Sequence, residues 1–584
     1  MGHTKQSGYT FYILPLLTTL ALWLFFGFYY PHHLHYQEQF QLFLLDSEYA
    51  WEVISWPGGL VDYIGRFLTQ FFLFAKVGAA LLAVLIASVQ MMTARQLGKG
   101  WLSCLGVLPP LLAVRLLCDE NALVGGIVAI LMAQLSAWCI SAIGNARLRR
   151  AIAIVCTPLF YWAIGPLGIV AVVLIAIDEM TKDPGVTKGA ISFIIMLLAL
   201  SLVLPALLES FVAVEPQYMY SGIHYMRSHG TDASSLWYVG LSVAILPIFA
   251  LAWKKGISPV SPWKTLILSL VLAVGGIFTL VKPAVNMKAE HVMAYDFMAR
   301  MQQWNRIQQT AISTPPNNAL STTALNLALA KSGRLGEKMF EYQQKGTIGL
   351  LPPFESDAMS PLATSEAYYQ IGMINTAQRF TFEAQEAILD YQKSARCYKR
   401  LAETNLINGN YPVARKYLVT LQKTLFYSDW ADQTLSLLGN EEAIDNHPEY
   451  GLLRRNCISY DSFYNENDYI GMLQQLYLSN RSNRLGFEYL LAACLLKKDL
   501  DMFVNVWGMN DAITYEAMPT YFQQALALWW SINKSNSEQT PPGVGQDITI
   551  GLMNFVKDAQ KHQNNREWMK KHYGTTYWYY YLTN

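Results

Sequence analysis

The feature that most constrains this chain is a series of long apolar runs that fills its first half and then stops. From residue 11 to about residue 281 the runs follow one another with little charge, whereas residues 282–584 contain scattered Lys, Glu, Asp and Asn. A bilayer core of ~30 Å is crossed by about 20 apolar helical residues. We therefore expect a membrane domain over residues 1–281 and a soluble domain over residues 282–584.

The apolar runs predict about nine membrane-spanning helices and, with the helical tail, an all-α protein. The expected spans lie near residues 11–30, 67–90, 102–117, 122–143, 151–164, 166–178, 190–211, 236–253 and 264–281. The first run follows a short polar start and lacks a small-residue cleavage site, so we interpret it as an uncleaved anchor.

The distribution of Lys and Arg predicts the orientation, because cytoplasmic loops are enriched in both. With the N-terminus in the cytoplasm, the inner loops hold most of the basic residues near these spans, namely Arg95, Lys99, Arg147, Arg149, Arg150, Lys182, Lys188, Lys254, Lys255 and Lys264. This agreement requires residues 151–178 to form two short helices that turn at Gly165-Pro166, since one bent helix would put the later lysines outside. We therefore predict a hairpin there, a bacterial inner membrane and a periplasmic tail.

The tail has the pattern of an α-helical repeat. In residues 401–425, Gly409, Tyr411, Ala414, Leu418 and Leu421 match the second-helix positions of a tetratricopeptide unit. Weaker copies over residues 327–340, 368–387 and 490–504 have irregular spacing, which predicts a degenerate solenoid. Such a stack usually binds a peptide or protein on its concave face, here expected to be an envelope protein or peptide; the alternative is that it only packs against the membrane domain.

The outer loops hold the polar residues that could carry chemistry. The residues that we single out are Glu38 and Asp46 in the loop over residues 31–66, Asp119 and Glu120 in the short second loop, and His224, Arg227 and His229 in the loop over residues 209–235, together with Arg115 in the run before Asp119. Charge inside a membrane is functional by default. The structural alternative for each is a solvated loop side chain, a polar turn or a histidine among the lipid headgroups.

Two family resemblances follow from these segments. The stretches QEQFQLF, PGGLVDYIGRFLTQFF and GTTYWYYY are similar to those of an uncharacterised family of bacterial multi-span membrane proteins with tetratricopeptide-like tails. The membrane domain also resembles the glycosyltransferase C superfamily: it has an acid soon after the first span, a long first outer loop, a brief acidic second loop and a short turning helix pair. The superfamily's early acid is commonly an aspartate, whereas the matching residue here is Glu38 beside Gln39.

The second resemblance implies transfer of a sugar from a polyprenyl-phosphate carrier at the outer leaflet. A carboxylate would take the proton of the acceptor hydroxyl, with Glu38 as the first candidate and Asp46 as the second. Asp119 or Glu120 would supply the partner acid or hold a divalent metal. Arg227, His224, His229 and Arg115 would meet the lipid phosphate, and arginine suits it best because its planar fork binds phosphate through two hydrogen bonds.

Other classes of function find little support. The 43 basic and 42 acidic residues provide no basic field for nucleic acid. The seven cysteines show no zinc-binding spacing, and no P-loop, GxSxG or HExxH motif occurs. The chief alternative is a non-catalytic membrane-anchored scaffold whose repeats recruit an envelope protein. A transporter is less favoured, because the runs contain few mid-span acids or interrupted helices.

Overall fold

The structure is a computed structural model that divides into two compact units. It describes residues 3–98, 101–182, 187–212, 215–222, 225–227, 234–253, 261–355, 357, 359–388, 392–458, 464–465, 467–533 and 540–583. The first unit comprises Met1–Glu290 together with Leu389–Ala395 and Lys423–Ser428, and the second comprises the remainder. Within the described residues every regular element is a helix, as the all-α prediction requires.

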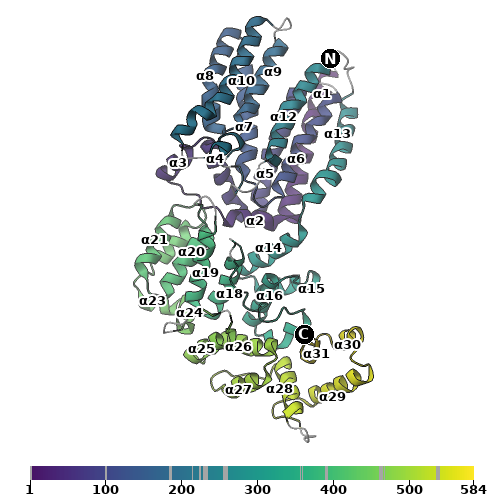
Figure 1. Ribbon diagram of the computed structural model, residues 1–584, viewed down its shortest axis with the longest axis vertical. Helices are drawn as coiled ribbons and strands as arrows, with labels where there is room; N and C mark the ends of the chain where they lie inside the picture. Colours follow the sequence, from purple (N-terminus) through teal and green to yellow (C-terminus); the bar gives the residue numbers. More distant parts are fainter. Residues whose placement is uncertain are drawn as a thin grey trace. The chain divides into compact units, whose positions relative to one another are not determined.

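The first unit is a bundle of long helices interrupted by short ones (Figure 1). Its helices are α1 His3–Leu24, α2 Pro31–Gln39, α3 Ser47–Ile54, α4 Gly59–Thr69, α5 Ala75–Leu97, α6 Leu108–Leu117, α7 Val124–Ser141, α8 Ala146–Ile164, α9 Gly168–Lys182, α10 Lys188–Leu208, α11 Pro216–Ser221, α12 Ser234–Trp253, α13 Pro262–Gly276 and the start of α14 Met287–Arg300.

Among the residues of this unit that the structure describes, six helices are long and apolar enough to cross a membrane. They cover Tyr12–Tyr29, Ala75–Leu97, Val124–Ser141, Lys188–Phe211, Ser234–Ala252 and Pro262–Ala284. The remaining three predicted spans correspond to the shorter apolar stretch Trp101–Leu117 and to α8 and α9, so the structure identifies six spanning candidates where the sequence predicted about nine. The second span also begins later than predicted, because residues 59–73 form α4 and a 3-10 turn before α5 starts.

Burial separates inner from outer helices among the six. In the candidate spans within α5 and α7, 56% and 61% of the residues are buried, compared with 17% for Lys188–Phe211. The exposed side chains of α10 are nevertheless apolar, including Ile195, Leu202 and Leu207. A helix that is apolar all round is stable where its outer face meets lipid.

The predicted hairpin at residues 151–178 is confirmed. Helices α8 and α9 are separate and turn at Gly165, whose φ of +83° is a conformation that side chains disfavour. The two helices are antiparallel, because Arg149 and Arg150 at the start of α8 both bond Glu179 at the end of α9. Gly165 also lies in a tight space: an added Cβ would come within 2.7 Å of the Tyr225 hydroxyl.

The second unit is built from shorter helices that follow one another as packed pairs (Figure 1). They are the end of α14, α15 Trp304–Ser313, α16 Ala319–Lys331, α17 Leu335–Lys338, α18 Ser360–Ile371, α19 Ile374–Glu386, α20 Ala395–Ile407, α21 Tyr411–Gln422, α22 Ser428–Leu435, α23 Glu441–Asn446, α24 Tyr450–Asn456, α25 Tyr469–Ser479, α26 Arg484–Lys497, α27 Leu500–Gly508, α28 Thr520–Asn533, α29 Gln546–Lys561, α30 Arg566–Tyr573 and α31 Tyr577–Thr583.

The clearest predicted repeat is a helix pair in the structure. Helices α20 and α21 are joined by a short turn in which Gly409 has a φ of +76°. Ala414, Leu418 and Leu421 are fully buried along α21, as the pattern of small and apolar positions requires. The sequence therefore locates this pair and its buried face correctly.

The aromatic C-terminal segment closes the second unit. Tyr577, Trp578 and Tyr580 are buried, and the indole N–H of Trp578 donates to the carbonyl of Gln524 at 3.0 Å. The hydroxyl of Tyr580 donates to the carbonyl of Leu496 at 3.0 Å, so it bonds the protein rather than water.

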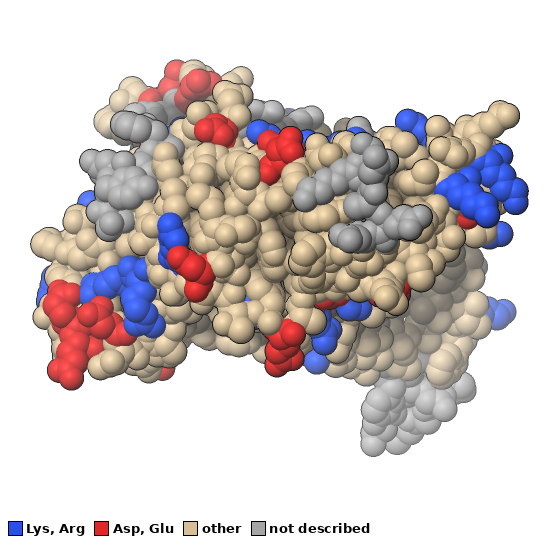
Figure 2. Space-filling model, turned by 90° about the horizontal axis from the view of Figure 1, so that it is seen from below, with Lys and Arg blue, Asp and Glu red and all other residues tan. Residues whose placement is uncertain are grey.

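On the face in Figure 2, small groups of acidic and basic side chains are scattered among uncharged residues in the part of the chain that the structure describes.

The buried ion pair that joins the start of α8 to the end of α9 is expected to stabilise the fold. Glu179→Gln leaves Arg149 and Arg150 without their counter-charge at a buried site, so we expect a loss of about 3–5 kcal/mol. Asp178→Asn is the matched control, because its pair with Lys182 is partly exposed and worth about 1 kcal/mol or less. Thermal unfolding of the detergent-solubilised chain measures both, and equal losses would contradict the buried pair.

Candidate functional site

A polar helix buried inside the first unit is the most unusual feature of the molecule. Helix α2 has the sequence PHHLHYQEQ, yet His33, His35, Gln37, Glu38 and Gln39 are all buried. A buried polar group without a hydrogen bond costs roughly 1–3 kcal/mol. Such a helix is retained only where neighbouring groups bond its side chains, and these groups define the candidate site.

The N-terminus of α2 is capped by a carboxylate from far along the chain. Glu290 of α14 accepts hydrogen bonds from the backbone N–H groups of His32 at 2.8 Å and His33 at 2.9 Å. These amides are among those that a helix cannot satisfy internally, and the partial positive charge at the helix start favours a carboxylate there. Burial nevertheless outweighs both effects and raises the pKa of Glu290 to about 7.

His33 lies at the centre of this end of α2. Its ring is fully buried, stacks on Tyr30 with centroids 5.0 Å apart, and lies 3.4 Å from the side-chain amide of Gln37. Burial lowers the pKa of His33 to about 4. The imidazole is therefore neutral at pH 7 and acts as a packed polar ring rather than as a cation.

Two further loops meet beside α2. The segments around Asn121 and Arg227 pair as a short antiparallel bridge, in which the Arg227 N–H donates to the Asn121 carbonyl at 2.7 Å and the Leu123 N–H donates to the Tyr225 carbonyl at 3.1 Å. The side chain of Gln37 then donates to the Ala122 carbonyl at 3.1 Å. Backbone pairing thus brings segments about 85 and 190 residues from α2 to its side.

Arg227 is the cation at this convergence. Its guanidinium lies over the ring of Phe40 at 4.9 Å and donates weakly to the Gln37 carbonyl at 3.4 Å. Its Nε is buried and has no hydrogen-bond partner among the described residues. Burial lowers the pKa of Arg227, while the nearby Tyr36 and Glu120 act in the opposite direction. The guanidinium therefore keeps donor capacity for an additional anionic group.

Glu38, the first predicted catalytic residue, is buried and bonded. The hydroxyl of Tyr427 donates to its carboxylate at 2.8 Å. Tyr427 belongs to Lys423–Ser428, one of the two short tail segments that form part of the first unit. Ser394, from the other segment, donates its hydroxyl to the carbonyl of Gln39.

The same tail segment engages the second predicted base. Asp46 precedes α3 and forms an ion pair with Lys423 at 2.6 Å. The hydrogen bond from Lys423 lowers the pKa of Asp46. Phe426 fixes the segment between these polar contacts, with its ring edge-on to Phe71 at 5.5 Å and to Phe74 at 5.2 Å.

The remaining predicted residues do not all lie at this site. Glu120 is half-buried beside Arg227, so the structure brings these two predicted residues together. Asp119 is exposed and accepts hydrogen bonds from the backbone and side chain of Asn121, as in a polar turn. Arg115 is exposed on α6. His224 and His229 lie outside the described residues.

The described residues hold no group of three or more His, Cys, Asp or Glu side chains that could bind a metal ion. His35 instead hydrogen-bonds the Phe72 carbonyl at 2.9 Å through Nδ1, and its ring is 5.4 Å from that of His32. No chemical step is assigned to a divalent metal.

Sequence reasoning missed Tyr427, Ser394 and Glu290. Each bonds α2 from more than 250 residues away, and no local pattern connects positions so distant. Glu290 left a faint signal, because it is a carboxylate that closely follows the last apolar run.

Over the described residues, the fold and the site define an all-helical protein with six candidate membrane helices and a buried polar helix bonded by several distant segments. The chain belongs to the DUF6057 family, a family of unknown function whose model matches residues 6–584. Comparison with curated proteins gave no match, and comparison with solved structures gave none either.

The raised pKa of Glu290 predicts a pH-dependent stability. The folded state binds the proton at about pH 7, whereas the unfolded chain binds it near 4.5. Glu290 therefore stabilises the fold most below pH 4.5, and this contribution falls as the pH rises through 7, by about 3 kcal/mol in total. Compared with Glu290→Gln, the wild type should lose thermal stability between pH 5 and pH 8.

The comparison between wild type and variant removes other titrations, including that of His33. The lowered pKa of His33 acts in the opposite direction, since its contribution is lost as the pH falls from 6.5 towards 4. Parallel melting curves for wild type and Glu290→Gln across pH 5–8 would show that the Glu290 carboxylate keeps its ordinary pKa.

The hydroxyl of Tyr427 is expected to stabilise the first unit through Glu38. Tyr427→Phe removes one charge-assisted hydrogen bond at a buried carboxylate, which costs about 1.5–3 kcal/mol. Lys423→Met is the control on the same segment, and its exposed ion pair should contribute much less. Thermal unfolding would contradict the assignment if Lys423→Met were the more damaging change.

Proposed function

We propose that this protein is a glycosyltransferase of the bacterial inner membrane that moves a sugar from a polyprenyl-phosphate donor to an envelope acceptor. The observation that carries the proposal is the buried polar helix α2, which includes Glu38 and is contacted at the Gln37 carbonyl by Arg227, an arginine with an unused donor. Burial strengthens electrostatic interactions and hydrogen bonds, and both proton transfer and phosphate binding depend on these interactions.

The proposed orientation rests on one basic end of the bundle. Arg95 at the end of α5 lies 5.1 Å from the Trp138 ring near the end of α7, and Arg149 bonds Glu179 at the end of α9. These positions gather at one end because the helices alternate in direction. By the positive-inside rule this end is cytoplasmic, which puts α2 and the tail on the periplasmic side.

In the proposed reaction, Glu38 takes the proton of the acceptor hydroxyl while that oxygen attacks the anomeric carbon. The bond from the anomeric carbon to the phosphate oxygen breaks, and the polyprenyl phosphate leaves with inversion at the sugar. Arg227 holds the phosphate through its free Nε–H, and Glu120 orients the guanidinium. Tyr427 positions the Glu38 carboxylate, so Tyr427 is a positioning residue rather than a catalytic one.

The second unit supplies the acceptor in this proposal. Its paired helices, of which α20 and α21 are the clearest, form a tetratricopeptide-like solenoid that recognises an envelope protein or peptide. The support is the buried apolar ridge of α21 and the turn at Gly409, the same features that define such repeats.

Mass spectrometry of co-purifying lipids tests the donor site and the base separately. We expect wild type to retain a polyprenyl phosphate or its sugar-linked form, and Arg227→Ala to lose it. Arg115→Ala is the matched control, because that arginine is exposed on α6. Glu38→Gln should keep the lipid and accumulate the sugar-linked form, since binding remains while proton transfer is removed.

The proposal fails if wild type, Arg227→Ala and Arg115→Ala retain the same lipids and none is a polyprenyl phosphate. It also fails if Glu38→Gln leaves a normal ratio of free to sugar-linked carrier. Expression level and elution volume of each variant report whether the fold is intact.

A membrane-anchored scaffold is the second candidate, and a specific contact favours it. The carboxylates of both predicted bases are occupied by the tail segment Lys423–Ser428, which is a structural use for them. A scaffold would keep its activity in Glu38→Gln and lose it when the repeat unit's exposed face is altered. Loss of function in Glu38→Gln with partner capture intact would exclude it.

A further inference from the structure

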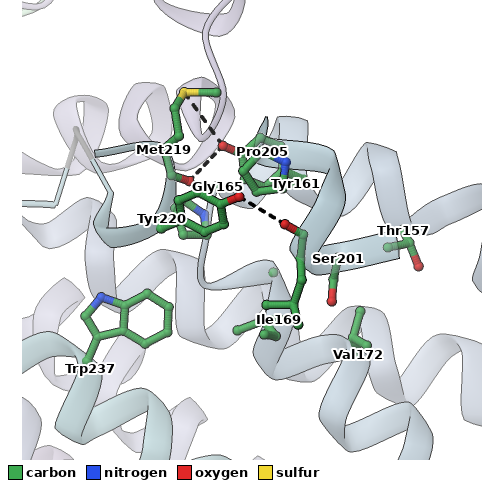
Figure 3. Close-up of a pocket in the computed structure, with 13 residues that line it drawn as sticks. Thr157, Tyr161, Gly165, Ile169, Val172, Ser201, Pro205, Met219, Tyr220 and Trp237 are labelled. Carbon is green, nitrogen blue, oxygen red and sulfur yellow. Dashed lines mark hydrogen bonds between the residues drawn. The ribbon is translucent and has the colours of Figure 1, made fainter. Parts of the chain in front are cut away.

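A cavity of about 160 Å³ lies within the first unit, away from α2 (Figure 3). Its walls come from the α8–α9 hairpin, from α10 and α11, and from the start of α12. Its volume is far above the ~15 Å³ that one water needs. The cavity can therefore hold a molecule segment of several heavy atoms.

The polar side chains of the cavity have no protons left to donate. Its two alcohols, its two phenols and its single indole each donate to a backbone carbonyl. The bonds are Thr157 to Ala153 at 2.8 Å, Tyr161 to Met219 at 2.8 Å, Ser201 to Leu198 at 2.9 Å, Tyr220 to Leu202 at 3.1 Å and Trp237 to Ser221 at 3.1 Å. A sugar or phosphate group would find no side-chain donor here, whereas a hydrocarbon needs none.

The remaining walls are apolar, and two of the lining residues are exposed. Ile169, Val172 and Pro205 line the cavity, and Figure 3 shows Val172 and Ile169 beside Ser201. Leu202 is 54% exposed and Tyr220 is 44% exposed, so the cavity opens beside them. Leu202 belongs to the candidate span Lys188–Phe211, whose exposed side chains are apolar, so the opening lies on a face that suits contact with lipid.

We propose that this cavity binds the acyl chain of a bilayer phospholipid. The bilayer supplies that chain at high concentration directly at the mouth, and apolar walls without a free side-chain donor suit its methylene groups. The bound chain fills the space between the α8–α9 hairpin and α10. The site does not depend on the transfer reaction, and Arg227 takes no part in it.

Native mass spectrometry of the full-length protein during stepwise delipidation tests the site. Wild type should keep one phospholipid after the bulk lipid is gone. Ser201→Phe, which fills the cavity from α10, and Val172→Phe, which fills it from α9, should each lower the retained fraction at least fivefold. Ser88→Phe is the matched control, because Ser88 also donates to its own helix and lies outside the cavity.

A second measurement reports the position of the chain. In nanodiscs of phospholipid brominated along the acyl chain, the Trp237 fluorescence should be quenched in wild type and Ser88→Phe but less so in Ser201→Phe, with Trp237→Phe defining the background. Retention of no phospholipid by wild type, or equal retention and quenching in all variants, would overturn the proposal. A retained polyprenyl phosphate that the filling variants displace would also overturn it and assign the cavity to an isoprenoid chain.

The two lipid experiments fail independently. A phospholipid that Ser201→Phe removes and Arg227→Ala leaves bound supports the acyl-chain site whatever the outcome for the transferase. A polyprenyl phosphate that Arg227→Ala removes and Ser201→Phe leaves bound supports the transferase alone.

Discussion

The structure depends on the burial of a polar helix. Helix α2 places imidazole, amide and carboxylate groups inside a unit whose other helices are largely apolar, and each such group must find a partner or lose free energy. The partners are Glu290 at its N-terminus, Ala122 and Arg227 along its side, and Tyr427 near its end. The hydrogen bonds to the polar groups of one short helix thus fix the positions of two loops and of two tail segments.

This arrangement also explains why the candidate site is where it is. Charged groups that a membrane-facing surface would exclude are tolerated at α2 because neighbouring loops bond them. Glu38 is held by the Tyr427 hydroxyl and Arg227 contacts the Gln37 carbonyl of the same helix, and such contacts limit the mobility of both side chains. The apolar cavity is lined by other helices, and each of its side-chain donors already bonds a backbone carbonyl. The first unit therefore keeps its buried charged groups apart from the apolar cavity.

The sequence predicts what is periodic and local. The apolar runs locate the six candidate spans of the described residues, the basic residues select the α8–α9 hairpin, and the spacing of Ala414 and Leu418 predicts the buried face of α21. It cannot predict Tyr427 against Glu38, because a contact across 389 residues leaves no periodic signal. For the same reason the sequence does not reveal that Glu38 is buried. Of the roughly nine predicted spans, six are long and apolar enough among the described residues, whereas α8 and α9 are too short or too charged to meet that test.

The burial of α2 can be measured directly by hydrogen–deuterium exchange of the full-length protein in detergent or nanodiscs. If α2 is enclosed as described, the amides of residues 31–40 exchange much more slowly than those of α3, a helix of similar length with an exposed tryptophan, Trp51. Exchange of residues 31–40 as fast as that of residues 47–54 would mean that the polar helix is open to water, and the account of the site would be wrong.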